Sequence, residues 1–79
     1  MTLAALSKPQ WDAALAAAHA LMHGNPGDAN DRATFREKKA RLAELLPDSA
    51  DATAIVSAAV RWDLRNSLAA SLVEMDVCQ

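Results

Sequence analysis

The longest pattern of apolar and polar positions lies between residues 49 and 76, a stretch that contains neither Gly nor Pro. On a helix with 3.6 residues per turn, its apolar residues fall into two stripes. The first stripe consists of Ala52, Ile55, Val56, Ala59 and Trp62. The second stripe consists of Leu64, Leu68, Leu72 and Met75. The two stripes lie on nearly opposite faces, so two different surfaces are needed to cover them.

Two interpretations explain this change of face. A break near Asn66 would give two helices, about 49–65 and 67–76, each with its stripe turned inward. Asn tolerates the left-handed conformation that ends many helices, which favours this interpretation. Alternatively, one straight helix of roughly 40 Å buries one end against its own chain and offers the other end to a second chain. We favour the break, because such a helix is long for so short a chain.

A first helix is predicted over residues 8–23. Ser7 and Gln10 have the spacing of a capping box, and Pro9 is tolerated in a first turn. The sequence GNPG at 24–27 provides typical stop signals. The predicted core face consists of Trp11, Ala14, Leu15, Ala18, Leu21 and Met22. The opposite face is nearly all alanine, which suits a solvated helix face and would also let another helix approach closely (Ala13, Ala16, Ala17 and Ala20).

A second helix is predicted over residues 29–46. Asp28 is in position to cap its start, and Pro47 follows its end. Its apolar stripe is narrow and consists of Phe35, Leu42, Leu45 and Leu46. On its charged face two i,i+4 pairs of favourable polarity are expected, Asp28 with Arg32 and Glu37 with Arg41. After Pro47, Asp48 or Ser49 is expected to cap the next helix.

These signals predict one all-α domain, a small antiparallel bundle of three or four helices. A chain of 79 residues buries only about 60–65% of its unfolded surface, so small domains usually need a disulfide, a metal or oligomerisation. Much of the apolar composition is alanine, which buries little area. Trp11 and Trp62 lie on apolar faces, and both are expected in the core, where they can meet.

The single cysteine, Cys78, excludes an internal disulfide and leaves a thiol that could crosslink two copies on oxidation. Neither a signal peptide nor a membrane span is visible, so we expect a cytoplasmic protein. The net charge is −2 and the calculated pI is about 5.5. This charge does not favour general binding to nucleic acids or anionic membranes.

His19 and His23 are spaced i,i+4, so their imidazoles could share a transition metal such as zinc. The zinc-protease pattern requires Glu directly after the first His, and that position holds Ala20. Both histidines also lie near a predicted helix C-terminus, where partial protonation is mildly stabilising. We therefore expect no cofactor and keep His19 and His23 as the only metal candidates.

Five basic residues lie between positions 32 and 41, and three of them, Arg32, Arg36 and Lys39, form one ridge on the second helix. Clustered cations can bind phosphates. No aromatic residue is interleaved for base stacking, and the chain is acidic, so a solvated face is the simpler interpretation. The same ridge could meet an acidic protein surface.

No catalytic arrangement of Ser, His, Asp or Cys stands out, and a domain this small has little room to bury a substrate. We therefore predict a non-enzymatic protein-binding module that inhibits or regulates a larger partner and associates as a homodimer through the second stripe. Its size and charge also suit an inhibitor made by a phage or mobile element against a host defence complex. The alternative is a nucleic-acid-binding regulator that uses Arg32, Arg36 and Lys39.

Overall fold

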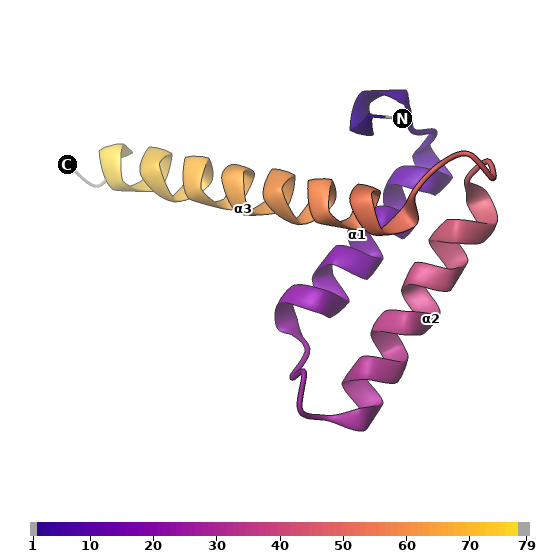
Figure 1. The fold of residues 1–79 in the computed structure, drawn as a ribbon. Helices are drawn as coiled ribbons and strands as arrows, with labels where there is room; N and C mark the ends of the chain where they lie inside the picture. The colour runs from indigo at the N-terminus through magenta and orange to yellow at the C-terminus, as the bar shows by residue number, and fades with distance from the viewer. Residues whose placement is uncertain (1, 78–79) are drawn as a thin grey trace.

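The protein is all-helical over the residues described. The structure is a computed structural model that describes the backbone of residues 2–77 and the side chains of residues 2–67. Its elements are a short 3-10 helix (Leu3–Ala5) and three α-helices: α1 (Lys8–His23), α2 (Ala29–Leu45) and α3 (Ala52–Val77). Figure 1 shows α1 and α2 side by side, joined by a short loop, whereas α3 crosses this pair. The fold class and three helices are thus confirmed, but the antiparallel arrangement of the whole bundle is not.

The start of α1 follows the predicted capping box. The Ser7 hydroxyl oxygen accepts a hydrogen bond from the Gln10 amide at 3.4 Å, and the Gln10 side-chain oxygen accepts one from the Ser7 amide at 2.8 Å. The Gln10 side chain also donates to the carbonyl oxygen of Leu45 at 2.7 Å. One residue therefore caps α1 and ties it to the end of α2.

The end of α1 depends on a glycine at position 24. Gly24 has an extended backbone with φ −80°, and its amide donates to the Ala20 carbonyl at 3.0 Å. A Cβ atom at Gly24 would lie 2.5 Å from that carbonyl oxygen, closer than real Cβ contacts. At Gly27 the nearest atom would be a side-chain oxygen of Asn25 at 3.3 Å.

Gly24→Ala is therefore expected to lower the free energy of unfolding by about 1–3 kcal/mol, because either the backbone or the α1 end must shift. Gly27→Ala, the matched control, is expected to change it by less than about 0.5 kcal/mol, since a side chain can move aside. Urea melts of the two variants followed by circular dichroism measure both values. Equal losses at the two glycines would contradict this role of Gly24.

The start of α2 is capped by Asp28, as predicted. Its carboxylate accepts from the amides of Asn30 and Asp31 at 2.7 and 3.3 Å. The two predicted i,i+4 ion pairs are wrong. The Arg32 guanidinium donates to the Pro26 carbonyl oxygen at 2.7 Å, and Arg41 pairs with Glu44 at 3.4 Å. Both arginine side chains are long and flexible, and each reaches a different acceptor from the one predicted. Sequence spacing alone therefore does not determine the partner of either arginine.

The start of α3 lies three residues later than predicted. A turn, closed by a hydrogen bond from the Ala50 amide to the Pro47 carbonyl oxygen at 2.9 Å, occupies the positions expected to begin the helix. The Asp51 carboxylate then accepts from the Thr53 amide at 3.0 Å. Asp51 therefore caps α3, and the prediction that Asp48 or Ser49 would do so is wrong.

The break predicted near Asn66 is absent, because α3 is one helix from Ala52 to Val77. Among the residues described, only backbones with negative φ occur, so Asn66 does not adopt the left-handed conformation. Its side-chain amide instead donates to the carbonyl oxygen of Trp62, one turn earlier, at 2.8 Å. Asn66 thus satisfies its side chain within the helix, and the alternative of one straight helix is the one observed.

The core lies where α1, α2 and the first half of α3 meet. Half of its eight buried members are alanines: Ala14, Ala17, Ala18, Leu42, Leu46, Ile55, Val56 and Ala59. Leu42 is the largest side chain that is fully buried in the part of the chain whose side chains are described. Ala17, which the pattern placed on the outer face of α1, is buried, and Leu21, which it placed in the core, is 49% exposed. The reason is that α1 packs against both other helices through alanines, which permit close approach.

The two tryptophans meet at the edge of this core. Their ring centroids lie 4.8 Å apart with an interplanar angle of 88°, an edge-to-face arrangement that favours association. Trp11 is half-buried, whereas Trp62 is 39% exposed. The predicted contact between the two tryptophans is confirmed, but Trp62 lies at the edge of the core and not inside it.

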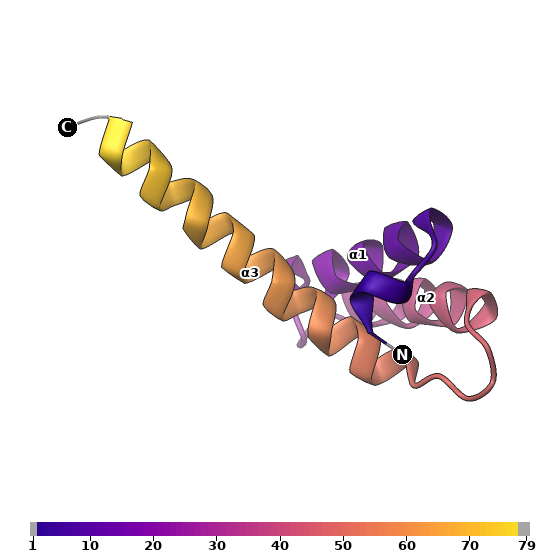
Figure 2. The same cartoon turned by 90° about the horizontal axis from the view of Figure 1, so that it is seen from above.

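The molecule is elongated. Its radius of gyration is 14.4 Å, compared with about 12 Å for a typical globular domain of this length. Both views show why: the far half of α3 runs away from α1 and α2 (Figures 1 and 2). Over the residues described, no helix combines the length and apolar character needed to cross a membrane.

Candidate interaction surface

The far half of α3, residues 64–77, projects from the rest of the fold (Figure 2). Before this point, Ile55, Val56 and Ala59 of the first stripe are buried against the other helices. Leu64, the first residue of the second stripe, is 59% exposed. The change of face that the sequence shows therefore coincides with the point where α3 leaves the core.

The rest of the second stripe continues along this projecting half. Leu68, Leu72 and Met75 occupy the register positions that follow Leu64 at intervals of three or four residues, and they belong to the same continuous helix. Their side chains lie outside the described residues. The structure thus places the predicted stripe on a projecting helix and describes the exposure of its first member only.

The basic ridge of α2 is not a cluster of free cations. Arg32 is exposed, but its guanidinium donates to the Pro26 carbonyl oxygen at 2.7 Å. Lys39 is half-buried, and Arg36 is exposed. Arg32 therefore holds the α1–α2 loop. Of the three ridge residues, only Arg36 is exposed and also lacks an ion pair or side-chain hydrogen bond to the described residues.

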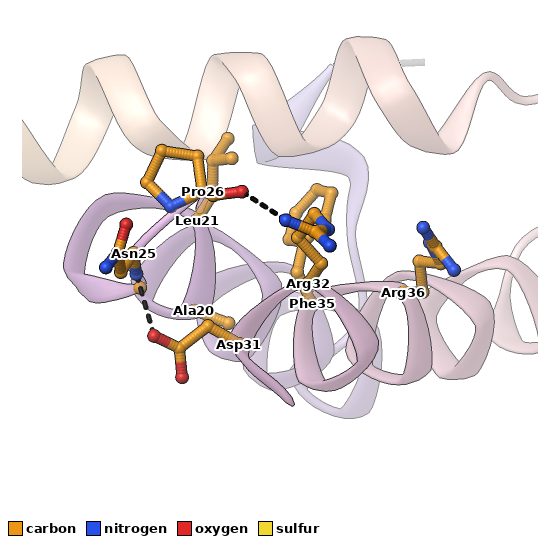
Figure 3. A pocket seen from close by; sticks show the side chains of 9 residues that line it. Ala20, Leu21, Asn25, Pro26, Asp31, Arg32, Phe35 and Arg36 are labelled. Atoms are coloured by element: carbon orange, nitrogen blue, oxygen red, sulfur yellow. Dashed lines mark hydrogen bonds between the residues drawn. The ribbon is translucent and has the colours of Figure 1, made fainter. Parts of the chain in front are cut away.

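A hollow of about 330 Å³ lies beside the α1–α2 loop (Figure 3). Leu21, Pro26 and Phe35 supply its apolar lining, and Arg32 and Arg36 contribute charge. Two hydrogen bonds cross this region. The Arg32 guanidinium donates to the Pro26 carbonyl oxygen, and the backbone amide of Asn25 donates to the Asp31 carboxylate at 2.8 Å (Figure 3). These hydrogen bonds hold the loop in place. Most polar groups around the hollow are therefore already bonded within the protein.

His19 and His23 lie next to each other on α1, with ring centroids 5.8 Å apart and an interplanar angle of 76°. The Nε2 atom of His19 is 3.4 Å from a carboxylate oxygen of Asp63 on α3. The described residues contain no group of three or more His, Cys, Asp or Glu side chains that could hold a metal ion. His19 thus links α1 to α3, a contact that sequence spacing within one helix cannot reveal.

Several features of these surfaces could not be predicted from the sequence. The exposure of Leu21, the hollow and the contact between His19 and Asp63 all depend on how different helices are placed. The direction in which α3 leaves the core was also not predicted, although the position of the change of face was. The signal for it was the pair of opposed stripes.

Comparison of the chain with known protein families, with curated proteins and with solved structures gives no match.

Proposed function

We propose that the protein is a non-enzymatic protein-interaction module that forms a homodimer through the projecting half of α3. The observation that carries this proposal is the 59% exposure of Leu64 on a continuous helix that extends past the core. Covering a leucine of this kind contributes about 25 cal/mol per Å² of apolar area removed from water. A helix that continues an apolar stripe past the core from an exposed leucine is therefore expected to find a partner.

The small core also supports association. The buried set contains four alanines and four larger residues, so one copy removes little apolar surface from water. Isolated helical segments shorter than about 12–15 residues are marginal in water. The projecting half, residues 64–77, has about this length, so pairing with a second copy would stabilise its helical state.

The second stripe faces away from the part of α3 that is already covered. At 100° per residue, Leu64 lies opposite Ile55 and about 140° from Ala59, both of which are buried. A second copy can therefore approach the projecting half without displacing α1 or α2. The α1–α2 pair would remain free to contact a larger partner.

Light scattering over a dilution series from about 1 μM to about 1 mM tests this proposal. We expect the mass to rise from the 8.4 kDa of one chain to twice that value, with helical content rising in parallel, because pairing stabilises the helical state of the projecting half. A mass that stays at one chain up to the highest concentration would contradict the homodimer.

A further inference from the structure

We infer that two copies pair their projecting halves in antiparallel fashion, with Arg65 of each chain against Asp76 of the other. This inference rests on the proposed function, and adds to it the direction of pairing and the ion pairs that fix it. It follows from the order of charges along α3, the register of the second stripe and the direction in which the helix leaves the core.

Charge is segregated along the second half of α3. Arg61 and Arg65, both exposed, lie where the helix leaves the core. Glu74 and Asp76 lie near its far end, and no charged residue occurs between positions 66 and 73. An antiparallel pair places the basic end of one helix beside the acidic end of the other. A parallel pair places residues of the same number at the same level, so like charges would meet at both ends.

The register of the second stripe fits the antiparallel direction. With residue 70 opposite residue 70, Leu68 lies level with Leu72 of the second copy, and Leu64 lies within one residue of Met75. In the same register Arg65 is within one residue of Asp76, about 1.5 Å along the axis. One alignment therefore matches the apolar stripe and the opposite charges together.

Arg65 and Asp76 also occupy the same flank of the stripe. At 100° per residue, their register positions differ by only about 20° around the helix. The two-fold axis of an antiparallel pair passes between the two helices and is perpendicular to both. It therefore places a given flank of one helix beside the same flank of the other copy. Glu74 lies on the other side of the stripe, so it is not brought against Arg65.

The rest of the fold leaves room for this arrangement. The projecting half lies beyond the crossing with α1, and its far end points away from the α1–α2 loop in both views (Figures 1 and 2). Antiparallel pairing puts the two α1–α2 pairs at opposite ends of the dimer. Within one chain, Arg65 and Asp76 are eleven residues apart, about 16 Å along the axis, so they cannot pair with each other.

Charge reversal tests the inference. We expect Arg65→Asp or Asp76→Arg alone to raise the dimer dissociation constant about tenfold, because each replaces two attractive pairs with two repulsive ones. The double variant, Arg65→Asp with Asp76→Arg, is expected to return to within about threefold of the original constant. Glu74→Arg, the matched control, makes the same change of charge two residues away and is expected to shift the constant less than about threefold.

The dissociation constants are measured by sedimentation at low salt, where exposed ion pairs contribute most. Failure of the double variant to recover, or an equal effect of Glu74→Arg, would overturn the antiparallel pairing while the dimer itself stands. A chain that stays monomeric before any substitution would overturn the proposed function instead. The two failures are therefore distinguishable.

Discussion

Leu42→Ala is expected to lower the free energy of unfolding by about 2–5 kcal/mol, because it empties the largest fully buried site of the described core. A domain of this length has only about 4–12 kcal/mol in total at typical stability per residue. Half of the buried core residues are alanines, which are too short to fill the space left by a leucine. The variant is thus expected to be partly unfolded at 37 °C.

Urea melts at low protein concentration measure this loss without a contribution from association. Leu64→Ala is the matched control, since it removes the same atoms from a side chain that is 59% exposed. Its expected loss under these conditions is less than about 0.5 kcal/mol. Equal losses for the two variants would show that Leu64 belongs to the core of the single chain.

Leu64→Glu is expected to weaken the dimer about 100-fold or more while leaving the melt of the dilute monomer unchanged. In one chain the new carboxylate remains in water, because position 64 is exposed. In the dimer it would be placed in an apolar contact without a partner, which is costly for a charge. Light scattering across the dilution series measures the change.

Asn66→Glu is the control for the added charge. Residue 66 is exposed and lies on the same part of α3, but on the face opposite the second stripe. We expect it to shift the dissociation constant less than about threefold. If Leu64→Glu instead unfolds the dilute monomer, the second stripe is part of the internal core and the proposed function fails.

Local features of the fold were predictable from the sequence. The Ser7–Gln10 capping box and the Asp28 cap each join groups within three residues, so their spacing is enough to identify them. The Trp11–Trp62 contact was also expected, although the partly exposed position of Trp62 was not. Such features depend on short-range chemistry and on apolar faces.

The prediction of a helix break at Asn66 was wrong, because one residue of low helix propensity is a weak signal for a break. Asn costs less than about 1 kcal/mol in a helix interior, and its neighbours are mostly good helix formers. Its side chain also finds a hydrogen-bond acceptor one turn back, on Trp62. The helix therefore continues, and the two stripes remain on opposite faces of one element.

The candidate surface could be predicted only in part. The second stripe is visible in the sequence from Leu64 onward, but whether it is covered depends on where α1 and α2 end in space. The hollow beside Leu21 and Phe35 likewise arises from the placement of two helices. Contacts between distant segments leave no periodic pattern along the chain, so only the structure reveals them.

Amide hydrogen exchange of residues 64–77 in the unmodified chain, compared at the dilute and concentrated ends of the same series, tests the account most directly. We expect rapid exchange in the dilute sample and clear protection in the concentrated one, with protection lost again in Leu64→Glu. Equal protection at both concentrations, or rapid exchange at both, would contradict the view that a second copy covers the far half of α3.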